Sequence, residues 1–221
     1  MIAEELINHM IPPLKLSDDA HKAMVWMEEF RCHQLPVVDQ GKFLGFVSEE
    51  ILLENNDIEK KLTDISLMGK KGHVHLSCHF FEILKIASDE KLQLLAVIDD
   101  DGNYCGVISI QDTLSSFAQT AAVQFPGGIL VLSLDFHDYS LSEISRLIEE
   151  NHGKILSSMV KEDPENPGKI RLTLKINQVD LSRIIATLER FGYKVIGLYQ
   201  EAKPSGNDQD RIDMLLRYLD I

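Results

Sequence analysis

Two segments of the chain repeat one pattern of apolar positions. Residues 14–48 and 74–109 align at a spacing of 60 positions, which grows to 61 beyond the tip of a hairpin. In each copy, apolar residues recur at i, i+3, i+4 and i+7, a spacing that marks one face of an α-helix. A short apolar stretch precedes each face. Each copy therefore predicts a short strand followed by a helix, whose apolar positions are Ala20, Ala23, Met24 and Met27 in the first copy and Phe80, Ile83, Leu84 and Ala87 in the second.

Two more apolar runs follow each predicted helix and predict a hairpin. The turns between the runs contain Gly41 and Gly102, because a tight reversal needs the positive φ that glycine supplies. A second helix is predicted after each hairpin, and in the second copy it runs roughly from Gln111 to Ala122. The first 120 or so residues thus predict one unit repeated twice.

The pattern changes after the Pro-Gly-Gly sequence at residues 126–128. Four alternating runs predict strands, and two helical stripes lie between them in the order βαββαβ, a ferredoxin-like plait. The fold class is predicted to be α+β, with repeat units over residues 1–62 and 63–124, the plait over 128–201, and a loop with a final amphipathic helix over 202–221.

Composition narrows the function. A content of 44% hydrophobic and 26% charged residues is typical of a soluble globular protein, and no apolar run approaches the roughly 20 residues of a membrane span. The start of the chain lacks a secretory signal, and three cysteines without CxxC spacing fit a reducing compartment, so we expect a cytoplasmic location. A formal net charge of −13 argues against nucleic acid as a partner.

The repeated unit resembles the CBS domain. The resemblance covers about residues 1–122 and depends on Leu-Pro-Val-Val-Asp at residues 35–39 and on Gly-Val-Ile-Ser-x-x-Asp at residues 106–112, each with a counterpart in the other copy. It implies that the copies pack as a pseudo-twofold disc, a Bateman module, with up to two clefts between them. It also implies a regulatory protein that binds AMP, ADP or ATP there.

The resemblance assigns roles to particular residues. Ser109 would donate a hydrogen bond to phosphate beside Gly106 and the following helix N-terminus, and Asp112 would accept hydrogen bonds from both ribose hydroxyls. The first copy keeps Ser48, a weaker candidate, but has Ile51 where the carboxylate belongs. Such bonds contribute about 1.5 to 3 kcal/mol each, so we expect at most one competent cleft. Helix capping by Ser109 and a favourable helix-dipole interaction of Asp112 explain the same residue types without a ligand.

The plait resembles the ACT domain, which implies amino-acid sensing or dimerisation. The loop Asp135–Ser140, however, has no glycine for close approach to a ligand, and Ser140 with Glu143 forms the capping-box pattern S-x-x-E. A CBS pair followed by an ACT-like domain resembles bacterial proteins of the acetoin-utilisation type. We expect a non-enzymatic, ligand-sensing homodimer that regulates an unknown protein. The alternatives are a purely structural dimerisation scaffold and an amino-acid sensor.

No cofactor or metal is expected. The cluster from His73 to His79 is rich in potential metal ligands, but its spacing does not bring them together without an unusually tight turn. Cys32 and His33 are adjacent, and neighbours at a helix end usually point apart, so they predict no nucleophile and base. Acidic residues around the turns of the second module are expected to form a solvated surface: Glu149, Glu150, Glu162, Asp163 and Glu165.

Overall fold

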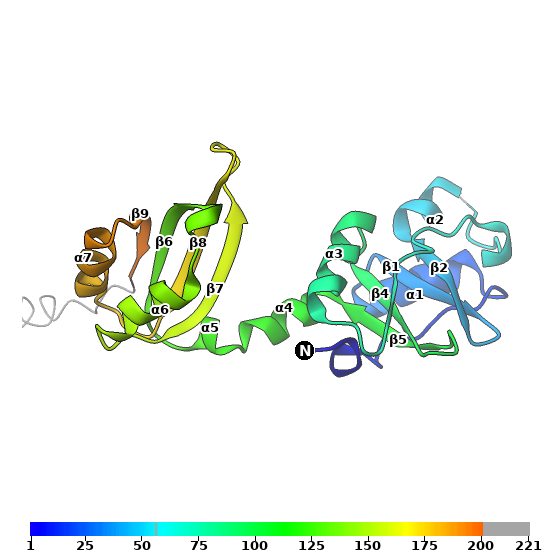
Figure 1. Cartoon of the computed structure of the whole chain (residues 1–221). Coiled ribbons are helices and arrows are strands. Elements are labelled where there is room, and N and C mark those ends of the chain that lie inside the picture. Colours follow the sequence, from blue (N-terminus) through cyan, green and yellow to red (C-terminus); the bar gives the residue numbers. More distant parts are fainter. Residues whose placement is uncertain (56, 201–221) are drawn as a thin grey trace, which may run out of the picture. The chain divides into compact units, whose positions relative to one another are not determined.

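The computed structural model describes residues 1–55 and 57–200, so the helix expected over 202–221 lies outside the described residues. The chain divides into two compact units, one ending at Phe117 and the other beginning at Ala118 (Figure 1). Within the described part of the chain, no helix is both long and apolar enough to cross a membrane.

The first copy begins after a 3-10 turn, Ala3–Leu6, and consists of two helices and a two-stranded sheet. Asp19 caps α1 by accepting a hydrogen bond from the Lys22 amide, and the left-handed Arg31 (φ 52°) ends it. Gln40 and Gly41 both have positive φ, 47° and 77°, as a tight hairpin requires. The elements are α1 (Ala20–Phe30), β1 (Gln34–Asp39), β2 (Lys42–Ser48) and α2 (Glu49–Asn55), followed by a 3-10 turn, Leu62–Asp64.

The second copy repeats this order with a three-stranded sheet. Its elements are β3 (His73–His75), α3 (Phe80–Glu90), β4 (Leu94–Ile98), β5 (Tyr104–Ser109) and α4 (Ile110–Ala118). β3 runs parallel to β4, which is antiparallel to β5. The corresponding strand expected near residue 14 is only a single bridge from Leu14 to Val37. The helix expected to reach Ala122 ends at Ala118, and a separate short helix, α5 (Ala121–Gln124), follows.

Both copies contribute to one hydrophobic core. Leu35 and Val37 of β1 and Leu95 and Val97 of β4 are fully buried in the same cluster. The copies are also joined by Gln34, which is 5% exposed. Its Nε2 donates to the Leu94 carbonyl at 3.1 Å, and its Oε1 accepts from the Gln93 amide at 3.4 Å. The repeat therefore folds as one body.

The second unit has the predicted order βαββαβ. Its sheet is antiparallel in the order β7-β8-β6-β9, and α6 and α7 pack on one face of it (Figure 1). Alternate residues of β6 and β8 point into this core, since burial alternates along both strands. The elements are β6 (Gly128–Asp135), a 3-10 turn (Phe136–Asp138), α6 (Leu141–Glu149), β7 (Ile155–Glu162), β8 (Lys169–Ile176), α7 (Ser182–Arg190) and β9 (Lys194–Tyr199).

One member of the expected acidic surface is not solvated. Asp163 is 7% exposed, and its carboxylate accepts hydrogen bonds from Asn166 Nδ2 at 3.1 Å and Arg171 Nη2 at 2.9 Å. The bond from Asn166, together with the nearby Arg171 charge, lowers the pKa of this carboxyl. The expectation was wrong for Asp163 because the β7–β8 turn folds back over its own carboxylate.

Candidate functional site

Ser109 and Asp112 line the same cleft, which we call the second-copy cleft. Its volume is about 580 Å³. The N-terminal segment, the C-terminal end of α1, the start of β4 and the N-terminus of α4 contribute to its walls. The lining residues are Asn8, Ile11, Phe30, Arg31, Cys32, His33, Gln93, Leu94, Ser109, Ile110, Gln111 and Asp112. The motif residues are thus placed together, next to side chains from three other segments.

Ser109 caps helix α4. Its Oγ accepts hydrogen bonds from the amides of Gln111 at 3.1 Å and Asp112 at 3.4 Å, while the Ile110 amide donates to the Gln93 carbonyl at 3.1 Å. Capping uses only the acceptor capacity of the hydroxyl, and its proton remains able to donate. The capping function and a contact to an anion in the cleft are therefore compatible.

Asp112 is exposed on the first turn of α4, and its Oδ2 accepts a hydrogen bond from Asn8 Nδ2 at 2.8 Å. Within residues 1–55 and 57–200, no hydrogen bond engages its Oδ1. Arg31 brings a positive charge to the same cleft, and no ion pair among the described residues neutralises its guanidinium. The cleft thus brings together a carboxylate, a hydroxyl group and a guanidinium.

Gly106 does not line the cleft and lies behind it. A Cβ at this position would come within 2.5 Å of Ile7 Cγ2. The next residue, Val107, accepts a hydrogen bond from the Asn8 amide at 2.7 Å. The close approach of the N-terminal segment to β5 therefore explains the glycine without a ligand contact.

The corresponding cleft around Ser48, the first-copy cleft, has the same backbone and different chemistry. Ser48 Oγ accepts from the Ile51 amide at 3.3 Å, and the Glu49 amide donates to the His33 carbonyl at 3.0 Å, as in the second copy. Its volume is about 490 Å³, and its walls carry three glutamates, Glu49, Glu50 and Glu54, against one lysine, Lys91. The missing carboxylate at Ile51 was recognised from the sequence, but the excess of negative charge was not.

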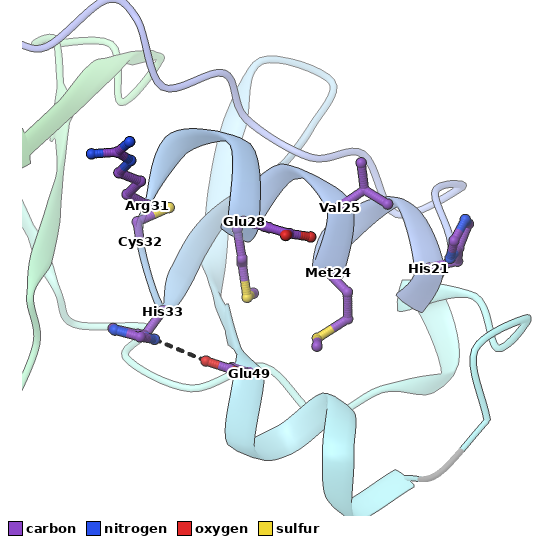
Figure 2. Close-up of a pocket in the computed structure, with 9 residues that line it drawn as sticks. His21, Met24, Val25, Glu28, Arg31, Cys32, His33 and Glu49 are labelled. Atoms are coloured by element: carbon purple, nitrogen blue, oxygen red, sulfur yellow. Dashed lines mark hydrogen bonds and ion pairs between the residues drawn. The ribbon is translucent and has the colours of Figure 1, made fainter.

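A third pocket of about 560 Å³ lies over α1 and the start of α2. Figure 2 shows Arg31 and His33 together at the C-terminal end of α1, at the opposite end from His21. His33 Nδ1 is 2.8 Å from Glu49 Oε2, so its ring pairs with a carboxylate and not with the Cys32 thiol. Burial raises the pKa of the Cys32 thiol, which keeps it protonated and a poor nucleophile.

Two histidines of the segment His73–His79 have hydrogen-bond partners of their own. His73 Nδ1 lies 3.2 Å from the Lys70 carbonyl, and His79 accepts from the Phe81 amide to cap α3. The Cys78 Sγ contacts Glu82 Oε2 at 3.6 Å, and burial together with this carboxylate raises the pKa of the thiol to about 11. In the described residues, no group of three potential ligands is placed to hold a metal ion.

A polar pocket of about 510 Å³ lies in the second unit beside the loop after β6. It contains three carboxylates, Asp135, Asp138 and Glu143, and two lysines, Lys169 and Lys194. Ser140 caps α6 through the Glu143 amide at 3.4 Å. The Glu143 side chain does not complete a capping box, since it accepts from the Tyr193 hydroxyl at 3.0 Å; burial and this bond raise the pKa of Tyr193 to about 12.

The CBS domain family model matches residues 3–56 and 67–118, which contain both repeats and both serine-capped helices. The N-terminal unit is a tandem pair of CBS domains. The mixed α and β fold expected from the sequence is thereby confirmed.

Solved structures similar to this chain match just over half of it. A CBS domain pair/ACT domain protein from Thermotoga maritima is 21% identical, with a TM-score of 0.49 over 54% of this chain and 98% of that one. A putative acetoin utilization protein (AcuB) from Vibrio cholerae is 20% identical, with a TM-score of 0.47 over 53% and 90%. CBSX2 in complex with AMP is 19% identical, with a TM-score of 0.47 over 53% and 96%.

Proposed function

We propose that this CBS pair is a non-catalytic sensor that binds one adenine nucleotide, in the second-copy cleft. The observation that carries the proposal is the convergence of Ser109, Asp112 and Arg31 on one cleft of about 580 Å³. Asp112 would accept hydrogen bonds from the ribose hydroxyls, and Ser109 and Arg31 would bind phosphate. The first-copy cleft has neither the acceptor nor the favourable charge, so the stoichiometry would be one nucleotide per chain.

Binding would regulate through geometry. A nucleotide that contacts both copies binds more tightly to one arrangement of the two lobes than to another, and it shifts the population toward that arrangement by its difference in affinity. The change in arrangement would be transmitted to a regulated partner protein.

The test is titration calorimetry with AMP, ADP and ATP on the protein and on Ser109→Ala. Ser48→Ala is the matched control, because both serines cap a helix in the same way and each loss destabilises by about 1 kcal/mol. We expect one site per chain, affinity reduced about tenfold by Ser109→Ala, and no change for Ser48→Ala. No heat at millimolar nucleotide would end the proposal.

A scaffold that only dimerises remains the second candidate, favoured by the apolar edge of the second unit. Ile196, Leu198 and Tyr199 on the edge strand β9 are 43%, 44% and 65% exposed, and an open strand edge pairs readily with another. The ACT-like unit would then join two chains through this edge. Light scattering on the protein and on Leu198→Lys measures it: a dimer that becomes a monomer, with no nucleotide bound, favours the scaffold.

A further inference from the structure

Asn8 is held by three hydrogen bonds, although it lies outside any secondary-structure element. Its backbone amide donates to the Val107 carbonyl at 2.7 Å, and its Oδ1 accepts from the Met10 amide at 2.9 Å. The remaining group, Nδ2, donates to Asp112 Oδ2 at 2.8 Å. Backbone groups thus fix both ends of the Asn8 side chain, and the amide that reaches Asp112 has a fixed direction.

The duplicated copy provides an internal comparison for this contact. Asn8 pairs with Val107 of β5 as Met68 pairs with Phe46 of β2, and Asp112 corresponds to Ile51. The hydrogen-bonded pair of the second copy, Asn8 and Asp112, thus corresponds to Met68 and Ile51 in the first copy. Both positions are polar in one copy and apolar in the other. The apolar pair packs against the hydrophobic core. A hydrogen-bonded pair replaced by an apolar pair at the same place indicates that the two positions act as one unit.

We infer that Asn8 is a positioning residue for nucleotide recognition, which holds the Asp112 carboxylate so that its free oxygen faces the vicinal diol of the ribose. This inference rests on the proposed function. An exposed aspartate on a helix can adopt several rotamers, and a diol requires one of them. Asn8 is a neutral donor, so it fixes the carboxylate without neutralising its charge, and Asp112 stays a strong acceptor for hydroxyl groups.

The test compares AMP with 2′,3′-dideoxy-AMP, which lacks both hydroxyls, by calorimetry on the full chain. The sharpest variant is Asn8→Asp. It preserves the acceptor for the Met10 amide but replaces the donor with a negative charge facing Asp112. We expect AMP affinity to fall about tenfold or more while affinity for the dideoxy compound is unchanged. Met68→Ala, at the corresponding position of the first copy, is the control and should change neither affinity.

A double-variant cycle shows whether Asn8 acts through Asp112. Asp112→Ala should abolish the preference for AMP over the dideoxy compound, and adding Asn8→Ala to it should have no further effect. If Asn8 contacts the ligand directly, the two losses will add, and the inference is overturned. Circular dichroism of each variant confirms that the CBS pair remains folded.

Failure of the proposed function and failure of the inference about Asn8 give different results in these titrations. Absence of binding of AMP, ADP and ATP alike by the unsubstituted protein would overturn the proposed function and the inference with it. Binding with a normal diol preference that survives in both Asn8→Asp and Asn8→Ala would overturn only the inference. The second result leaves Ser109 and Asp112 as the binding residues without a positioning partner.

Discussion

The two clefts of the CBS pair share one backbone and differ in their chemistry. In both, a serine caps the helix that opens the cleft, and the first helical amide donates to the carbonyl of the residue just before β1 or β4, His33 in the first copy and Gln93 in the second. In the second copy the walls carry Asp112 and Arg31. In the first copy Ile51 stands at the position of Asp112, and the walls carry three glutamates. The same capping is present in both copies, and on the proposed function only a few side chains would determine whether a cleft accepts an anion.

The largest expected effect on stability comes from alanine substitutions at the corresponding glycines of the two copies, Gly45 and Gly106. A Cβ at Gly45 would lie 2.8 Å from the Met68 carbonyl oxygen, whereas a Cβ at Gly106 would meet the Ile7 side chain, which can rotate away. Both φ values are positive, 150° and 157°. We expect Gly45→Ala to lower the free energy of unfolding by about 3 kcal/mol and Gly106→Ala by less, measured by urea denaturation. Gly41→Ala, with no atom within 4 Å, should cost about 1 kcal/mol. Equal losses at Gly45 and Gly106 would contradict the difference between the copies.

The next prediction concerns the residue that joins the two copies. Gln34→Leu should lower the free energy of unfolding by about 1 to 3 kcal/mol, because the Leu94 carbonyl and the Gln93 amide lose their buried partner. Gln111→Leu, on the exposed surface of α4, is the control and should change stability by less than about 0.5 kcal/mol. Thermal unfolding measures both, and a stable Gln34→Leu protein would show that water replaces the side chain.

A nucleotide site engineered in the first-copy cleft would separate the effect of the missing carboxylate acceptor from the effect of the three glutamates. Ile51→Asp combined with Met68→Asn supplies the acceptor pair to the first-copy cleft, but we expect one nucleotide per chain, because Glu49, Glu50 and Glu54 still repel phosphate. Adding Glu50→Gln and Glu54→Gln should raise the stoichiometry to two in calorimetry. A second site in the double variant alone would show that the glutamates are unimportant.

The smallest expected effect lies in the other unit. The pKa of Asp163 is lowered by its bond from Asn166 and by Arg171 nearby, so the folded state binds this proton less readily than the unfolded chain, whose value is near 3.8. The carboxylate therefore stabilises the unit above that pH, and the contribution is lost as the pH falls through the lower folded value. Asp163→Asn should flatten the stability of the protein between pH 5 and about pH 2 relative to the unsubstituted chain, measured by urea denaturation. An unchanged pH profile would contradict the lowered pKa.

The sequence predicted regular elements well and local interruptions poorly. The 3.6-residue spacing located α1 and α3, although Leu84 of the face predicted for α3 is 39% exposed and Ile86 packs against the core instead. The predicted end of α4 was wrong because nothing in the spacing of apolar residues marks the actual end at Ala118. Gln124 Nε2 donates to the Ala118 carbonyl at 2.7 Å, and the Thr120 carbonyl accepts from the amides of Val123 and Gln124 in α5. A helix break that is stabilised by a side chain six positions away does not change the spacing of the apolar residues, so the sequence pattern does not reveal it.

The candidate site was predicted only where a local motif carries it. Ser109 and Asp112 belong to one seven-residue motif, and the structure places both at the same cleft. Asn8 lies 104 positions from Asp112, and no spacing rule connects them. Likewise, Arg31 joins the cleft only because the end of α1 packs beside the N-terminus of α4. Contacts of this kind depend on how the copies pack, which a single sequence does not specify.

His33 belongs to the walls of both clefts and of the pocket over α1. A molecule that turns this imidazole on entering one cavity also reshapes the neighbouring one. Thermodynamic reciprocity then requires the second occupant to change the affinity of the first by the same factor. In that case two unlike ligands would be coupled through the single imidazole of His33.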